Sequence, residues 1–213
     1  MSIDWFEAEQ DQAYSEFVDS LAAELYEEHK EQAIEEFVGQ RLASYYVKNP
    51  TIAEQAVAFL KKAEVYRETE SVASLLLSST ATEVILKSVL LKPIVYGLVH
   101  TESLAELISS GLVKQTGIGR FKELVFRILE HHIEFEEGID NFSRDGSKIP
   151  LWKERDEIQK VRNAVLHQAA PCASAEAILS FEVAMTFINL TNSLLSNIGF
   201  KFSKSGIIVR DSE

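Results

Sequence analysis

The chain of 213 residues contains one cysteine, four prolines and nine glycines. A single cysteine, Cys172, permits no internal disulfide, so nothing in the composition argues for an oxidising compartment. The first ten residues are acidic and contain no apolar run, so no signal peptide is expected. These absences predict a cytoplasmic protein.

Long uninterrupted hydrophobic runs are also scarce. The most apolar stretch, Val84 to Val99, is interrupted by Lys87, Lys92 and Pro93 and is too short to span a bilayer comfortably. Because 46% of the residues are hydrophobic, the chain can still bury a sizeable core. We interpret the stretch as core and expect no membrane partner.

Several signatures of metal and cofactor sites are missing. None of the five histidines has a glutamate three residues before it, so the paired ExxH motifs of a di-iron bundle are absent. The histidine-containing cluster from Glu130 to Glu136 has no second set of ligands and is interpreted as an exposed charged face. Gly117-Ile118-Gly119 lacks both the third glycine and the Lys-Ser/Thr ending of phosphate-binding loops, and no GxSxG motif occurs. The sequence therefore predicts no metal and no cofactor.

The net charge of -12 is distributed unevenly along the chain. Residues 1–70 contain 16 acidic and 6 basic side chains, a balance of -10, which leaves -2 for residues 71–213. Broad, sequence-independent binding of nucleic acid needs a basic surface, so this balance argues against a general DNA or RNA coat protein. A local basic site remains compatible with it.

Helical periodicity dominates the sequence, which indicates an all-α fold. The segment from Asp4 to Lys48 predicts one long amphipathic helix or two in series. Asn49-Pro50-Thr51 predicts a break and a restart, with Pro50 in the first turn of a new helix and with capping-box spacing between Thr51 and Glu54. This second helix either ends near residues 69–71 or continues into the next segment.

Residues Val72 to Leu91 are apolar nearly all round, which is typical of the central helix of a bundle. Pro93 is expected to end or kink it. The later segments are predicted as a helix Thr101–Ser110 closed by Gly111, a helix Gly119–Glu137 closed by Gly138, a loop Asp140–Pro150, a helix from Leu151 to about Gln168, and a helix capped by Ser174 and ending at Asn197 before Gly199. Residues Phe200 to Val209 could form a small hairpin or simply trail off.

These segments predict three parts of the chain. Residues 1–48 would be an acidic helical extension, residues 49–199 a helical bundle, and residues 200–213 a tail or short hairpin. Within the central helix, Glu83 and Lys87 are four residues apart, the spacing of a helical ion pair. A charged pair in so apolar a helix is either structural or lines a site.

The segment from Lys160 to His167 brings a lysine, an arginine, an amide and a histidine onto one short helical stretch. Arginine suits bidentate contact with phosphate, histidine can exchange a proton near neutral pH, and Asn163 can orient either group. On an ideal helix, however, His167 lies about 140° around the axis from Arg162 and about 7.5 Å further along it. One copy of the segment therefore cannot converge on one ligand unless the helix bends or two copies combine. A pairing of Cys172 with His167 as a nucleophile is the weaker alternative, because a cysteine near a helix end is usually inert.

Arg162-Asn163-Ala164-Val165-Leu166-His167 resembles the RxxxxH signature of the HEPN domain, an all-α family found in many prokaryotic toxins and defence proteins. Ser79 to Lys87 is similar to the family's buried helix with an acidic residue and a lysine one turn on. The likeness spans roughly Pro50 to Asn197, which would make the bundle a HEPN-type bundle.

The resemblance implies a homodimeric, metal-independent endoribonuclease acting as a toxin or defence effector on RNA. Arg162 and His167 of both subunits would line a shared cleft, with Asn163 positioning the reacting group and with Glu83, Lys87 and Lys160 lining the site. A cognate antitoxin or defence-system partner is also implied. Ala169 stands where many members carry a tyrosine that a partner enzyme modifies, so control at that position is not expected. Some members of the family are non-catalytic modules for RNA binding, protein binding or dimerisation, and that alternative stays open.

Overall fold

The computed structural model describes residues 39–99, 101–114 and 118–211. It divides into two compact units, Met1–Arg41 and Leu42–Glu213. The helical prediction for residues 4–38 lies outside the described residues. The elements after the helical residues 39–48 are α2 (Glu54–Tyr66), α3 (Ser71–Val84), the π-helix η1 (Ile85–Leu91), α4 (Lys92–Leu98), α5 (Glu102–Lys114), the 3₁₀ helix η2 (Ile118–Phe121), α6 (Lys122–His132), α7 (Leu151–Gln168), α8 (Ser174–Asn197), β1 (Phe200–Phe202) and β2 (Ile208–Arg210).

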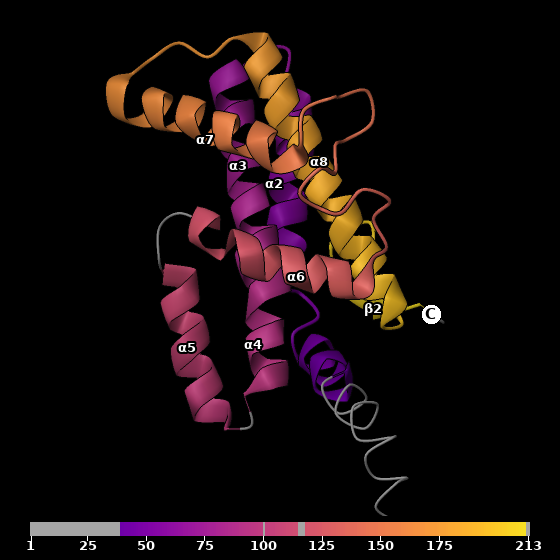
Figure 1. The fold of residues 1–213 in the computed structure, drawn as a ribbon. Helices are drawn as coiled ribbons and strands as arrows, with labels where there is room; N and C mark the ends of the chain where they lie inside the picture. Colours follow the sequence, from indigo (N-terminus) through magenta and orange to yellow (C-terminus); the bar gives the residue numbers. More distant parts are fainter. Residues whose placement is uncertain (1–38, 100, 115–117, 212–213) are drawn as a thin grey trace, which may run out of the picture. The chain divides into compact units, whose positions relative to one another are not determined.

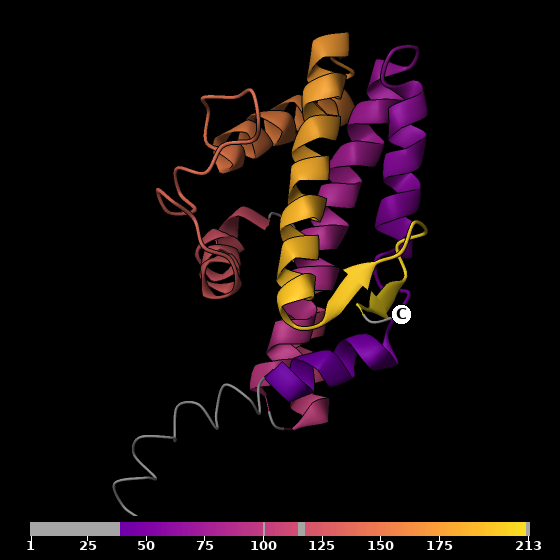
Figure 2. The ribbon, with the colours of Figure 1, turned by 90° about the vertical axis from the view of Figure 1, so that its right-hand side faces the viewer.

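The described unit is a helical bundle, which confirms the all-α prediction. Helices α2, α3 and α8 pack side by side, and α7 crosses α3 and α8 (Figures 1 and 2). Small hydroxyl side chains at these contacts let the helices approach closely and hydrogen-bond to the neighbouring backbone. The Oγ of Ser74 in α3 donates to the carbonyl of Ala63 in α2 at 2.8 Å, and the Oγ of Ser180 in α8 donates to that of Leu75 at 3.5 Å.

Two apolar clusters meet at the central helix. One joins η1, α6, α7 and α8 through residues such as Leu90, Leu129, Trp152 and Phe187. The other joins the helical residues 42–46, α2, η1, α8 and the hairpin. Residues 42–48, which the sequence places in the N-terminal extension, thus contribute Tyr46 and its neighbours to the core of the second unit.

The central helix continues through Pro93, so the expected end at this proline is not observed. Elements α3, η1 and α4 follow one another without a break from residue 71 to residue 98, and the π-helical turns precede the proline. Pro93 has no N–H for the carbonyl of Val89, four residues earlier. The buried hydroxyl of Tyr46 donates to that carbonyl at 2.8 Å instead. Burial, followed by the nearby Tyr45, raises the pKa of Tyr46, so this hydroxyl stays protonated and can donate.

Residues 200–210 form a small hairpin, which is one of the two alternatives that the sequence left open. β1 and β2 pair antiparallel, with Lys201 opposite Val209. Gly206 in the turn has φ +89°, and a Cβ there would lie 2.7 Å from Cγ2 of Val57 in α2, so the position needs glycine. The N–H of Ile208 donates to the carbonyl of Pro50 at 2.8 Å, which ties the hairpin to the start of α2.

Several predicted helix ends were wrong. α2 begins at Glu54 without a side-chain cap, so neither Pro50 in a first turn nor the capping box of Thr51 is observed. α8 begins at Ser174 itself, and the carboxylate of Glu176 caps it by accepting from the N–H of Ala173 at 2.7 Å. Of the two alternatives for the second helix, the break near residues 69–71 is observed, and the predicted end of α8 before Gly199 is confirmed.

The two middle helices also differ from their predicted lengths. α5 runs through Gly111 to Lys114, because a glycine with no strained backbone angle weakens a helix without ending it. α6 stops at His132, well before Gly138, and residues 133–150 form an irregular segment. Its apolar side chains, including Phe135, Phe142 and Ile139, still contribute to the first cluster.

Two helices of the described residues are long and apolar enough to cross a membrane by length and composition, Ser71–Gly97 and Ser174–Asn197. The first is longer than the apolar stretch seen in the sequence because it continues through α3, η1 and α4. In it, 61% of the apolar window is buried inside the protein, against 44% for α8. The buried core helices of soluble proteins meet the same criteria of length and composition, so these two helices are only weak evidence for a membrane span.

Candidate functional site on helix α7

Helix α7 carries four of the six residues predicted for the site. It begins after Pro150 and ends at Gln168, as predicted. Ala169 follows in the left-handed conformation with φ 52°, and its N–H bonds to the carbonyl of Ala164. Pro171 comes two residues later, after the helix has ended. His167 therefore lies in the last turn of the helix.

Arg162, Asn163 and His167 lie in the last two turns of α7, and the C-terminal end of this helix extends beyond α3 in Figure 1. Asn163 and His167 are exposed and Arg162 is half-buried, so the arginine and the histidine are not both packed into the core. The Nε of Arg162 is buried and has no hydrogen-bond partner within the described residues. Because α7 is a regular α-helix over this segment, Arg162 and His167 remain about 140° apart around its axis.

Lys160 is exposed and is held by its own helix. Its Nζ lies 2.6 Å from Oε1 of Glu157, three residues earlier. The hydrogen bond and the negative charge of Glu157 raise the pKa of Lys160. An exposed pair of this kind contributes little to stability, so Lys160 can exchange this partner for a ligand at small cost.

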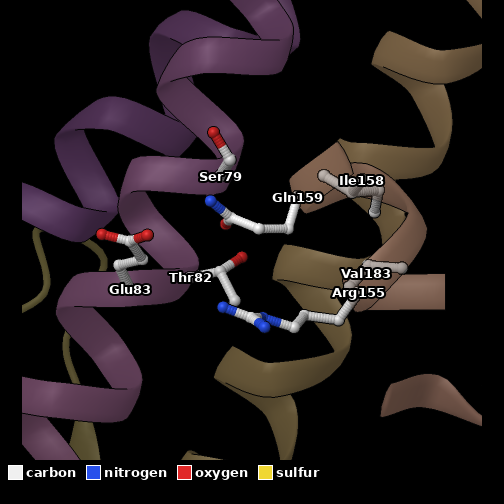
Figure 3. A pocket seen from close by; sticks show the side chains of 7 residues that line it. All are labelled: Ser79, Thr82, Glu83, Arg155, Ile158, Gln159 and Val183. Carbon is white, nitrogen blue, oxygen red and sulfur yellow. The ribbon is translucent and has the colours of Figure 1, made fainter. Parts of the chain in front are cut away.

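Glu83 and Lys87 form the helical ion pair that their spacing predicts, with 4.0 Å between Nζ and Oε2. The side chain of Lys87 is only 10% exposed, against 24% for Glu83. Glu83 faces a small pocket between α3 and α7, whereas Lys87 does not line it (Figure 3). The structure therefore brings Glu83 to α7 and leaves Lys87 as its partner within the central helix.

Polar groups from both helices surround this pocket. Its lining comprises Ser79, Thr82 and Glu83 from α3, Arg155, Ile158 and Gln159 from α7, and Val183 from α8. In Figure 3 the side chains of Gln159 and Arg155 extend from α7 towards Thr82 and Glu83. The enclosed space is about 10 Å³, which is room for about one water molecule. The pocket is therefore too small for a nucleotide.

Arg155, like Gln159, is a residue of this site that the sequence analysis missed. It is buried, and its Nη1 lies 2.9 Å from Oδ1 of Asp156. The guanidinium carbon lies 5.4 Å from the centre of the Trp152 ring, in the range of a cation–π contact. Its Nη2 is buried without a hydrogen-bond partner within the described residues. The available signal was the spacing from Trp152 and Ile158, both three residues away, which places Arg155 on the inward face.

Gln159 connects the pocket to the predicted site. Besides lining the pocket, it donates from Nε2 to Oδ1 of Asn163 at 3.1 Å. Asn163 is therefore oriented by the helical turn that faces Glu83. Gln159 therefore connects the predicted residue Glu83 of the central helix to the predicted residue Asn163 of α7, whose relative positions the sequence could not give.

The remaining candidates do not form a site. His131 and the glutamates 130, 134 and 136 are exposed, as expected, and within the described part of the chain no three potential metal ligands come together. Burial, followed by the neighbouring His131, lowers the pKa of the half-buried His132. Burial, followed by Glu176, raises the pKa of Cys172, which keeps the thiol protonated and unreactive near neutral pH.

No protein-family profile, no curated protein and no solved structure matches this chain. The interpretation of the site consequently rests on its own residues and geometry.

Proposed function

We propose that this protein is a HEPN-type, metal-independent endoribonuclease that acts as a toxin or defence effector. The observation that carries the proposal is the position of His167, which is exposed in the last turn of α7, five residues after the half-buried Arg162 and four after the exposed Asn163. The site is completed at a homodimer interface, because the two side chains on one helix diverge by about 140°.

The reaction is cleavage of RNA by its own 2′-hydroxyl. The 2′-oxygen forms a bond to the adjacent phosphorus while the bond from phosphorus to the 5′-oxygen breaks. His167 of one subunit accepts the 2′-hydroxyl proton, and the protonated His167 of the partner subunit gives a proton to the leaving 5′-oxygen. Arg162 stabilises the charge on the phosphorane, and Asn163, held by Gln159, positions the phosphate. The products carry a 2′,3′-cyclic phosphate and a 5′-hydroxyl.

The other predicted residues have supporting roles. Lys160 can contact an RNA phosphate as a point charge after releasing Glu157. Glu83 and Lys87 stabilise the helix behind Gln159 rather than touch the substrate. An antitoxin or defence-system partner would silence the enzyme by covering the end of α7.

A non-catalytic HEPN-like module for RNA or protein binding is the second candidate. The observation that favours it is the net charge of -12, which weakens attraction to RNA. Such a module would keep the fold and the dimer and would tolerate loss of His167.

The decisive experiment incubates the purified chain with total RNA and excess EDTA. We expect cleavage by the wild-type protein and a loss of about 100-fold or more in rate for Arg162→Ala and for His167→Ala, because each removes a group that acts on the transition state. Mapping of the RNA ends should find 5′-hydroxyls.

Arg127→Ala and His131→Ala are the matched controls, since both residues are exposed and lie on α6, outside the proposed site. Both should cleave like the wild type. Cleavage that survives either site substitution, or that requires added metal, would contradict the mechanism. Binding of RNA without any cleavage would favour the second candidate.

A further inference from the structure

A groove of about 420 Å³ lies beside α8, between that helix and the loop that carries Phe142, Arg144 and Asp145. Its α8 side extends from Phe181 to Ser193. At 1.5 Å per residue this is about 18 Å, or roughly three turns of a helix. The groove shares no residue with the site proposed on α7.

The floor of the groove is apolar and partly open to solvent. It is formed by Phe142, Phe181, Met185 and Leu190, of which the first three are only half-buried. Aromatic side chains and methionine are enriched at the centres of protein interfaces, and methionine adapts its shape to a partner. Such a floor suits the apolar face of a second protein segment.

The loop wall of the groove is fixed before anything binds. The Nε of Arg144 lies 2.9 Å from Oε2 of the buried Glu154, and its Nη1 lies 2.8 Å from Oε2 of Glu182 in α8. Ser147 donates to the other carboxylate oxygen of Glu154 at 2.7 Å. A preformed wall reduces the entropy lost when a ligand binds.

The charges around the groove favour a basic ligand. Arg144 supplies one positive charge and is already shared by Glu154 and Glu182, while Asp145 is exposed and forms no ion pair within the described residues. A second cation, Arg67, lies 5.8 Å from the centre of the Phe181 ring and is paired with Glu68 at 3.9 Å. Two cations against four carboxylates leave a local charge of -2. The exposed amide of Asn189 on the rim can hydrogen-bond to a ligand. A second copy of a chain with a net charge of -12 would be repelled here.

We propose that the α8 groove binds a basic amphipathic helix of a partner protein. The apolar face of that helix packs on Phe181 and Met185, and its lysine or arginine side chains reach Asp145 and Glu182. The straight, three-turn length along α8 fits a helix lying in a groove rather than a compact small molecule. The proposal does not depend on the nuclease function.

The test titrates the full chain with two designed helical peptides that share one apolar face, flanked by lysines in one peptide and by glutamates in the other. We expect the lysine peptide to bind at least about tenfold more tightly, and its affinity to fall as salt is raised, because the attraction is partly electrostatic. Amide shifts in NMR spectra should change around Phe181 to Ser193.

Two rim substitutions, Asp145→Lys and Asn189→Arg, should each weaken the lysine peptide about fivefold or more, because each adds positive charge to the rim. Neither breaks a side-chain interaction that the structure shows. Glu64→Lys is the matched control, since Glu64 is exposed on α2 away from the groove, and it should bind as the wild type does. Thermal unfolding of each variant confirms that it is folded.

Equal binding of the two peptides, no binding at about 1 mM, or unchanged binding by the rim variants would overturn the proposal. If light scattering shows that Asn189→Arg separates a dimer into monomers, a second copy of the chain occupies the groove and the proposal is wrong.

Discussion

Arg155 is a cation in the core of α7 whose hydrogen-bonding needs are only partly met. The Nη2 has no partner within the described residues, while Nη1 binds Asp156 and the planar group lies near Trp152. A buried donor without a partner costs about 1–3 kcal/mol, and a charged one costs more. The cation–π contact returns about 1–2 kcal/mol when it is desolvated. The two effects are of similar size, so Arg155 contributes little net stability.

Replacing Arg155 by methionine should therefore leave the free energy of unfolding unchanged or raise it by about 1–2 kcal/mol. Methionine is similar to the aliphatic stem of arginine and removes the buried guanidinium charge. Asp156 is about half exposed, so water can solvate it after its partner is removed. Urea-induced unfolding measures the change.

Arg155→Ala is the control for this prediction, because it removes the charge and the packing together. It should destabilise the protein by about 2 kcal/mol or more through the cavity that it leaves. If Arg155→Met is as destabilising as Arg155→Ala, the guanidinium group makes a strong bond at the pocket and the proposed balance is wrong.

The π-helical element η1 depends on a contact from another part of the chain. Pro93 offers the carbonyl of Val89 no N–H four residues on, and the hydroxyl of Tyr46, from the segment before α2, donates to that carbonyl. The central helix therefore passes through a proline that sequence rules expect to end or kink it. A long-range side-chain contact compensates for a local defect.

Tyr46→Phe should lower the free energy of unfolding by about 1 kcal/mol or more, because it removes a buried hydrogen bond to the carbonyl of Val89. Pro93→Ala restores a backbone N–H one turn after Val89, so in a Pro93→Ala background the same substitution should cost about 1 kcal/mol less. A double-mutant cycle by chemical unfolding measures this coupling.

Tyr45→Phe is the matched control, since Tyr45 is also buried but its hydroxyl donates to no protein group within the described residues. It should cost less than about 0.5 kcal/mol. Strictly additive effects of Tyr46→Phe and Pro93→Ala would show that the hydroxyl does not compensate for the proline.

At the scale of the whole molecule, the proposed nuclease needs two chains. The end of α7 extends beyond α3 and exposes Leu166, a large apolar side chain, next to His167 (Figure 1). An apolar residue beside the proposed histidine suits an interface that buries this end of the helix.

Leu166→Asp should convert the proposed dimer into a monomer and abolish cleavage, because it places a charge in the interface without altering Arg162 or His167. Light scattering at micromolar concentration measures the mass, and the EDTA assay measures activity. Leu107→Asp is the control, since Leu107 on α5 is even more exposed, at 70% against 47% for Leu166. A wild-type monomer, or an active monomeric variant, would remove the composite site.

Much of the fold was predictable from local patterns. The apolar periodicity correctly predicted the central helix, α7 and α8, and the hairpin was one of two alternatives for residues 200–209. Helix ends were less predictable, because Gly111 is tolerated within α5, while α6 ends after His132 where the chain turns into the loop. At the site, the ion pair of Glu83 with Lys87 followed from spacing, whereas the exposure of Asn163 and His167 did not.

The sequence by itself determined the all-α class, the acidic charge and the divergence of Arg162 from His167, because periodicity and helical geometry depend only on neighbouring residues. Tertiary structure alone decided that Tyr46 donates to the carbonyl of Val89 beside Pro93, and that Gln159 links Asn163 to the pocket of Glu83. The first contact joins residues that are 43 positions apart. The second depends on which face of α7 packs against α3 and α8. Local patterns carry no information on such pairings, since they arise only when the helices pack.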